Sequence, residues 1–114
     1  MLVASSCDVI LNNQVGCLFE MGQIEFSSGV FSLAKDEGLD FDAFLEDHKR
    51  GNWGQIDKLD VEANELSLGV GGQLFSSFFI GDKYSSSDIW LITDSDRSRT
   101  RVLLPTEWAP VLFF

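Results

Sequence analysis

The spacing of apolar residues changes once along the chain, at the glycine-rich segment Gly69-Val70-Gly71-Gly72. Before it, over residues 27–68, apolar residues recur every three or four positions, which is typical of helices packed by one face. After it, apolar stretches are short, rich in β-branched and aromatic residues, and separated by turn-forming residues. Helices followed by consecutive strands predict an α+β fold.

Two helices are expected between residues 27 and 50. Ser27 and Ser28 can cap the first helix, and Gly38 can end it. Asp40 can cap the second helix, in which apolar residues recur at spacings of three and four and so share one buried stripe. The residues of this stripe are Phe41, Phe44 and Leu45.

A third helix is expected over residues 57–68. Leu59, Ala63 and Leu66 lie four and three positions apart and therefore share one face. We expect these three side chains, together with Ile56, to point toward the core.

Strands are expected near residues 22–26, 74–80, 89–93 and 100–104. The run Ile89-Trp90-Leu91-Ile92-Thr93 is almost continuously apolar, which indicates a central strand covered on both faces. The fold predicted is a small antiparallel sheet of about four to five strands, with two to three helices packed on one face.

The length of 114 residues predicts a single domain, 1–114. Its core is expected at about residues 22–108, preceded by an N-terminal strand extension, 1–21, and followed by an apolar tail, 109–114. The tail contains Val111, Leu112, Phe113 and Phe114, which form an apolar end that can join two copies. A homodimer is therefore one alternative.

The net charge of −10 arises from 18 acidic and 8 basic residues. Such a chain is poorly suited to direct binding of nucleic acid, which requires clustered Lys and Arg. No apolar run approaches the roughly 20 residues that span a bilayer, and no basic segment precedes the apolar residues at the N-terminus. We expect no membrane association and a cytoplasmic location.

The acidic residues are concentrated in the first part of the chain. Residues 1–66 hold 13 acids and 4 bases, whereas residues 67–114 hold 5 acids and 4 bases. One interpretation is a solvated helical surface that aids solubility. The other is a partner-binding surface whose carboxylates replace phosphates in the basic groove of a nucleic-acid-handling protein. The residues expected on this surface are Asp36, Glu37, Asp42, Glu46, Asp47, Glu62 and Glu65.

Metal binding is not expected. Cys7, Cys17 and His48 supply at most three of the four ligands of a structural zinc site. Asp94 and Asp96 lack a third oxygen ligand for a hard cation. We expect no metal and no other cofactor, and the pairing of the two cysteines stays open.

A second group of polar residues could form a pocket for a small, nucleotide-like ligand. In this hypothesis Trp53 stacks on a ring and Arg97 binds an anionic group. Alternatively, Arg97 binds Asp60 or Asp94 and pins the strand turn to the helices, while Asn52 and Asn64 satisfy backbone groups. The pocket candidates are His48, Asn52, Trp53, Asp60, Asp96 and Arg97.

Catalysis is a weaker alternative for the same residues. His48 could act as a general base, oriented by Asp60 or Asp96, with Ser98 as the nucleophile. No nucleophile elbow surrounds Ser98, and residues 69–72 lack the Lys and Ser/Thr of a phosphate-binding loop. We therefore assign no catalytic residue and do not expect an enzyme.

Two motifs resemble those of a family of small uncharacterised proteins carried on plasmids and phages. They are Gly51-Asn52-Trp53-Gly54, where the family has Gly-Asp-Trp-Gly, and Ile92-Thr93-Asp94-Ser95-Asp96-Arg97-Ser98-Arg99-Thr100, followed by Leu103-Leu104-Pro105. The family pattern there is Ile-Thr-x-x-Asp-Arg-Ser-x-Thr and Leu-Leu-Pro. Asn52 departs from the pattern and puts an acidic role at that position in doubt, and Trp108 replaces a Tyr.

The resemblance implies a mobile genetic element in a bacterial host, where small accessory proteins often protect the element from host defence. Together with the acidity, it predicts a protein that binds and inhibits a nucleic-acid-targeting defence protein, of anti-CRISPR or anti-restriction type. The expected partner is a protein with a basic groove. The alternative function is the binding of a small ligand in the pocket described above.

Overall fold

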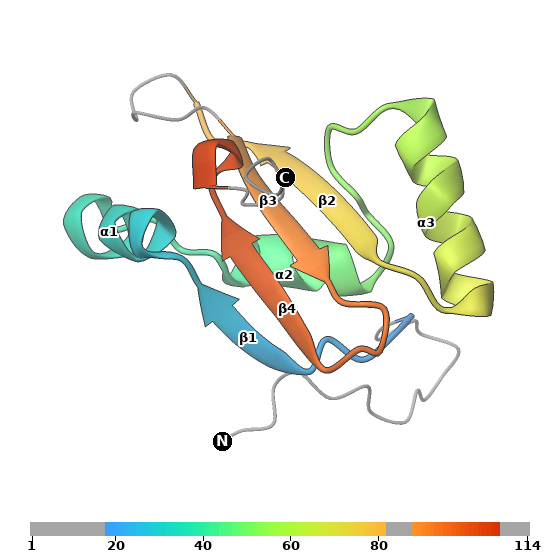
Figure 1. Cartoon of the computed structure of the whole chain (residues 1–114). Coiled ribbons are helices and arrows are strands. Elements are labelled where there is room, and N and C mark those ends of the chain that lie inside the picture. The colour runs from blue at the N-terminus through green and yellow to red at the C-terminus, as the bar shows by residue number, and fades with distance from the viewer. Residues whose placement is uncertain (1–17, 82–87, 108–114) are drawn as a thin grey trace, which may run out of the picture.

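The computed structural model describes residues 18–81 and 88–107, which form an α+β fold as predicted (Figure 1). Within these residues, the sheet has four strands, and three helices follow the first strand and precede the second along the sequence. A short 3₁₀ turn, η1, follows the last strand. The elements are β1 (Gln23–Phe26), α1 (Ser28–Glu37), α2 (Asp42–Lys49), α3 (Lys58–Val70), β2 (Leu74–Phe79), β3 (Asp88–Thr93), β4 (Arg99–Leu103) and η1 (Pro105–Glu107).

The sheet has the strand order β1-β4-β3-β2. Strands β2, β3 and β4 form an antiparallel meander, as predicted. Strand β1 instead pairs in parallel with β4, with Gln23 opposite Arg99 and Phe26 opposite Val102. The sheet is therefore mixed, because the helices carry the chain from one edge of the sheet to the other before the meander begins.

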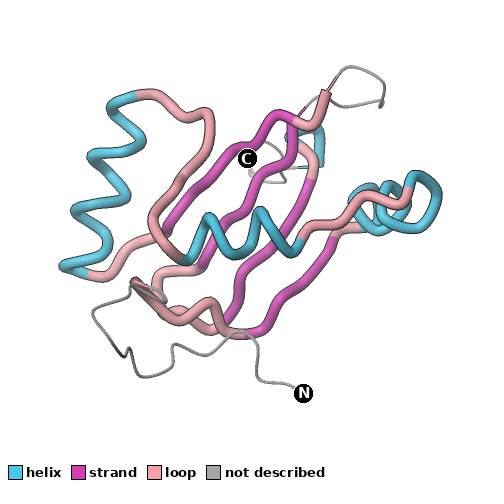
Figure 2. The backbone as a smooth tube through the Cα atoms, turned by 180° about the vertical axis from the view of Figure 1, so that it is seen from behind, coloured by secondary structure: helices cyan, strands magenta, loops and turns pink. Residues whose placement is uncertain are grey.

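The three helices occupy different positions around the sheet. Helix α2 crosses behind the sheet in Figure 1 and in front of it in Figure 2, whereas α1 and α3 lie beyond opposite edges. The main core forms where Val30 and Leu33 of α1, and Phe41 just before α2, pack on alternate strand residues. These strand residues are Phe78, Ile89, Leu91 and Val102.

Both ends of α1 follow the capping residues expected from the sequence, whereas the prediction that Asp40 caps α2 is wrong: the N-cap is Phe41, and Asp40, one residue earlier, accepts from Asp42 N. Ser27 caps α1 by accepting a hydrogen bond from Val30 N, and Gly38 ends it in a left-handed conformation. Asp57 caps α3 in the same way, accepting from Asp60 N. These local features therefore determine where α1 and α3 begin and where α1 ends.

The orientation of α3 is the opposite of the one expected. Leu59 and Leu66 are 74% and 66% exposed, and Ala63 is exposed as well, whereas Val61 and Leu68 pack against the core. The helix carries two apolar stripes, and the sequence prediction chose the wrong one. Ile56, just before the helix, does pack against the core as expected.

Asn64 explains why α3 turns this way. Its side chain is buried, with Nδ2 donating to the Phe75 carbonyl at 2.8 Å and Oδ1 accepting from Phe75 N at 3.0 Å. The amide thus pairs with the outer edge of β2 as a neighbouring strand would. A buried amide with both groups satisfied fixes the rotation of α3, and Val61 and Leu68 follow it inward.

The segment before α3 covers the rest of this edge. Gln55 N donates to the Ser77 carbonyl at 2.6 Å, and Ser77 N donates to the Trp53 carbonyl at 3.1 Å. Gly54 lies between them with φ of 77°, and a Cβ there would overlap the Ser77 carbonyl. The second glycine of the Gly-x-Trp-Gly motif therefore has a structural role, and the edge of β2 is closed to further strands.

Several sequence predictions lie outside the described residues. They concern the first 17 residues of the strand extension, both cysteines and the apolar tail from residue 109. Among the helices that are described, none combines the length and the apolar character that a membrane crossing requires.

Candidate functional site

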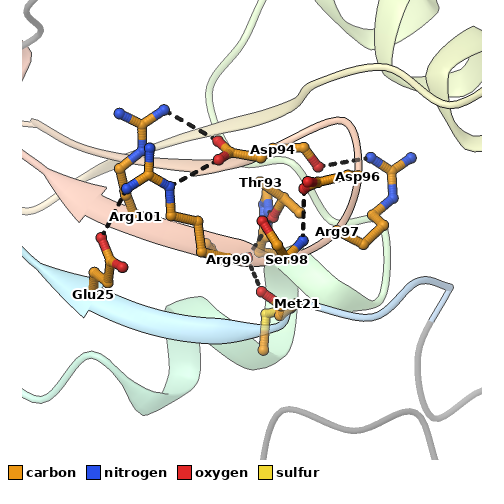
Figure 3. A network of polar contacts seen from close by, with 11 residues as sticks. Met21, Glu25, Thr93, Asp94, Asp96, Arg97, Ser98, Arg99 and Arg101 are labelled. Atoms are coloured by element: carbon orange, nitrogen blue, oxygen red, sulfur yellow. Dashed lines mark hydrogen bonds and ion pairs between the residues drawn. The ribbon is translucent and has the colours of Figure 1, made fainter.

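Arg97 holds the β3–β4 turn against the end of α3. Its guanidinium donates to the carbonyl oxygens of Gly72 at 2.5 Å and Ser67 at 3.0 Å, and to that of Ser95 within its own turn. It also donates to the Asp94 carbonyl (Figure 3). The expectation that Arg97 pins the turn to the helices is confirmed. Its partners, however, are backbone carbonyls, not the carboxylates of Asp60 or Asp94.

The Asp94 carboxylate lies between two other arginines on the same side of the sheet (Figure 3). Its oxygens lie 2.8 Å from Arg99 Nε and 3.1 Å from Arg101 Nη2. Arg99 also contacts Glu25 at 3.3 Å, which links β1 to β4. The hydrogen bond to Asp94 and the charge of that carboxylate raise the pKa of Arg99. These partly exposed ion pairs stabilise the sheet surface only modestly.

His48 lies at the centre of a buried chain of hydrogen bonds. Its Nδ1 is 2.5 Å from Ser76 Oγ, and its Nε2 is 2.9 Å from Thr93 Oγ1. Thr93 Oγ1 in turn lies 2.6 Å from Thr100 Oγ1, which donates to the Met21 carbonyl at 2.8 Å. The chain therefore connects α2 with three strands.

The Met21 carbonyl sets the direction of every proton in this chain. Because Thr100 donates to that carbonyl, it accepts from Thr93, and Thr93 accepts from the Nε2–H of His48. His48 Nδ1 is then the acceptor for the Ser76 hydroxyl. Burial, together with the charge of Arg97, lowers the pKa of His48 to about 3, so the ring is neutral.

Trp53 belongs to the same buried centre. Its ring stacks on Phe19 at 6.1 Å and meets His48 edge-on at 5.6 Å. The Arg97 guanidinium lies 5.9 Å from the Phe19 ring centroid. The structure thus brings together three of the ligand-pocket candidates, but as a packed interior.

The predicted ligand pocket is not formed among the described residues. His48 and Trp53 are buried against protein, and Arg97 is bound to carbonyls, so none of the three presents free groups to a ligand. The other candidates, Asn52 and Asp60, are exposed elsewhere. The sixth, Asp96, is exposed at the β3–β4 turn.

The catalytic alternative also lacks its geometry. Both ring nitrogens of His48 are engaged by Ser76 and Thr93, and neither contacts Ser98. Ser98 N instead donates to Asp96, and hydrogen bonds from Ser98 lower the pKa of that carboxyl. Among the described residues, no three His, Cys, Asp or Glu side chains converge as metal ligands.

The predicted partner-binding acids do not form one surface. Asp36 is exposed on α1, whereas Glu62 and Glu65 are exposed on α3, beyond the opposite edge of the sheet (Figure 1). On α2, Asp42 and Glu46 are exposed and Asp47 is half-buried. Glu37 lies in the last turn of α1, and its side chain is outside the described set.

Local cations neutralise part of this charge. Glu46 lies 3.2 Å from Lys49 Nζ and 3.5 Å from Arg50 Nη2. Glu62 and Glu65 take part in no ion pair among the described residues. Asp36 on α1 and Asp42 and Asp47 on α2 are likewise without ion pairs in the described part of the chain, so α3 is one of several places where unneutralised acids are exposed.

The outward side of α3 carries an apolar stripe beside Glu62 and Glu65. Leu59, Leu66 and Val70 are 74%, 66% and 72% exposed, and Ala63 lies between the two leucines. The spacings of four, three and four residues place the four side chains on one face. We call these residues with Glu62 and Glu65 the outer face of α3.

A hollow of about 260 Å³ adjoins the outer face of α3. Asp60 and Ala63 form its helical wall, and Phe75 and Trp90 form its floor on the sheet. The two aromatic rings meet edge-on, with centroids 5.2 Å apart. Trp90 alternates with the core residues Ile89 and Leu91 and therefore lies on the face of the sheet away from α2. Ala63 belongs to both surfaces, so the stripe and the hollow are continuous.

Sequence reasoning missed this combined surface. The sequence pattern predicts Leu59 and Leu66 inside and places Val70 in the glycine-rich segment between helix and strand. The available signal was a second apolar pair, Val61 and Leu68, seven residues apart on the same helix. A helix with two apolar stripes can bury only one of them against its own sheet.

No protein-family model, curated protein or solved structure matches this chain.

Proposed function

We propose that this chain is a non-enzymatic binding protein that docks a basic protein partner through the outer face of α3. In the mobile-element setting implied by the motif resemblance, the partner is a nucleic-acid-targeting defence protein, which the chain inhibits. Localisation in the cytoplasm of a bacterial host belongs to the same proposal.

The observation that carries this proposal is the exposure of Leu59, Leu66 and Val70 on one helical face. Burial of such side chains contributes about 1.5–3 kcal/mol each, or roughly 5–9 kcal/mol for three. Association itself costs about 4–15 kcal/mol, so the apolar stripe alone gives at best weak binding. Charge complementarity must therefore supply part of the affinity and the specificity.

The charges of α3 favour a basic partner over a second copy of the chain. Glu62 and Glu65 border the stripe, and Lys58 is the one basic residue in the helix. An antiparallel pairing of two α3 helices would bring these carboxylates toward their counterparts, in a chain whose net charge is already −10. A partner with Lys or Arg beside an apolar groove avoids this repulsion.

A plating assay tests the proposal. Cells carrying a restriction or CRISPR system are challenged with a targeted phage, with and without the protein. We expect expression to raise the efficiency of plating at least tenfold against one of these systems. We also expect Leu59→Ser/Leu66→Ser to abolish the rise.

The matched control is Phe31→Ser, which removes another exposed apolar side chain, 60% exposed, from α1. This variant should protect as well as the wild type. Reversal of Glu62 and Glu65 to Lys should abolish protection as well. Absence of protection against every system, or full protection by the α3 double variant, contradicts the proposal.

A further inference from the structure

We propose that the hollow beside α3 receives a lysine or arginine side chain of the protein partner. The inference rests on the proposed function and identifies the chemistry by which the partner is recognised. It assigns Trp90, Phe75 and Asp60 to a single binding site.

The size of the hollow fits one side chain. Its volume of about 260 Å³ is below the roughly 300–1,000 Å³ of pockets that hold drug-sized ligands. Asp60, the one charged residue of the lining, also disfavours an anionic ligand such as a nucleotide. A long basic side chain has an apolar stem that can lie on the sheet and a charged end that can stay at the rim.

The lining of the hollow suits a side chain with an apolar stem and a charged end. Phe75 and Trp90 are both half-buried and offer aromatic surface to an alkyl stem. A cation within about 6 Å of an aromatic ring face is attracted by about 0.5–2 kcal/mol. The edge-on arrangement of the two rings, at 86°, points aromatic surface in two directions.

Two polar side chains at the rim of the hollow are available to bind the charged end of a basic side chain. In the part of the chain that the structure describes, the carboxylate of Asp60 and the side-chain amide of Gln73 make no hydrogen bond or ion pair, although both line the hollow. Asn64, by contrast, is fully used by Phe75. Asp60 thus supplies the negative charge and Gln73 an acceptor oxygen.

A neighbouring hollow places further carboxylates beside the first. It measures about 260 Å³, shares Gln73 with the first and is otherwise lined by Asp94, Ser95 and Asp96. Asp94 is bound by Arg99 and Arg101, whereas Asp96 accepts hydrogen bonds from Ser98 and takes part in no ion pair among the described residues. A cation entering from either side therefore meets a carboxylate.

The arginines nearest to the hollow do not cancel its preference for a basic side chain. Arg97 directs its guanidinium to the carbonyls of Gly72 and Ser67, and Arg101, opposite Ile92 in the sheet, is paired with Asp94 at 3.1 Å. The first hollow contains Asp60 as its one charged lining residue.

The test uses a defined probe: a 14-residue amphipathic peptide of leucine and lysine, labelled for fluorescence anisotropy. We expect Asp60→Asn and Trp90→Leu each to weaken its binding, the latter about tenfold. Asp36→Asn, which removes one exposed charge from α1, should change Kd less than twofold. An arginine version of the peptide should show the same pattern, and a norleucine version should bind weakly to all variants.

Asp60→Asn keeps the test decisive if Trp90→Leu fails to fold, since Asp60 is exposed. Equal Kd values for wild type and Asp60→Asn, or no binding of either basic peptide, overturn the inference. In the plating assay, protection that survives Asp60→Asn and Trp90→Leu but is lost in Leu59→Ser/Leu66→Ser removes the side-chain pocket while the proposed function stands. Protection lost in none of these variants removes both.

Discussion

The buried centre around His48 and the outer face of α3 place polar and apolar groups in opposite ways. Around His48, polar groups lie inside the protein, and each hydrogen bond of the chain has a defined donor and acceptor. On α3, apolar groups lie outside, next to carboxylates without ion-pair partners among the described residues. The first arrangement is complete within the chain, whereas the second, in the proposed function, is completed by a partner. Polar residues that look functional in the sequence can therefore be structural, and apolar residues that look structural can form the interface.

The largest effect is expected from His48→Leu. The leucine would leave the buried hydroxyls of Ser76 and Thr93 without their imidazole partner, which lowers the free energy of unfolding by about 3 kcal/mol or more. Urea denaturation at pH 7 measures this, with Asp36→Asn as an exposed control. A loss below about 1 kcal/mol would show that the hydrogen-bonded chain contributes little to stability.

Lowering the pH should reduce the free energy of unfolding through protonation of His48. The pKa of His48 is about 3 in the folded protein and near 6.5 when unfolded, so between these values the unfolded chain binds the additional proton. Stability is therefore complete above pH 6.5 and falls by about 1.4 kcal/mol per unit below it, or about 2 kcal/mol by pH 5. Urea denaturation over pH 7 to 5 checks the slope, which His48→Leu should remove. A wild-type stability that stays constant over this range contradicts a neutral, buried His48.

Arg97 connects the two regions, because it binds both its own turn and the end of α3. Arg97→Ala removes the hydrogen bonds to Gly72 and Ser67 and should reduce stability by about 1.5 kcal/mol. Arg97 has φ of 62°, so Arg97→Gly should lose about 0.5–1 kcal/mol less than the alanine variant. Thermal unfolding of the two variants compares them. Equal losses would mean that the backbone conformation at residue 97 carries no strain.

Local sequence features predicted the helices and the antiparallel meander well. Ser27 and Gly38 act through neighbouring backbone groups, so their effect is readable from a few residues. The parallel pairing of β1 with β4 joins residues more than 70 positions apart, and no short pattern encodes it.

The site was harder to predict, because it depends on which of two apolar stripes α3 buries. That choice is made by Asn64, whose partner Phe75 belongs to a strand beyond the helix. The prediction of a ligand pocket was wrong for a related reason. His48, Trp53 and Arg97 do lie near one another, but the hydrogen-bond partners of His48 and Arg97 include Ser76 and Gly72, which lie outside both motifs.

The central claim is that the outer face of α3 serves binding and not folding. The most direct measurement is the efficiency of phage plating with Leu59→Ser/Leu66→Ser, made once its free energy of unfolding is known. We predict a stability within about 1 kcal/mol of wild type, because both side chains are exposed, together with complete loss of protection. Full protection by this variant, or a stability loss of several kcal/mol, would instead place the two leucines among the residues that hold the fold.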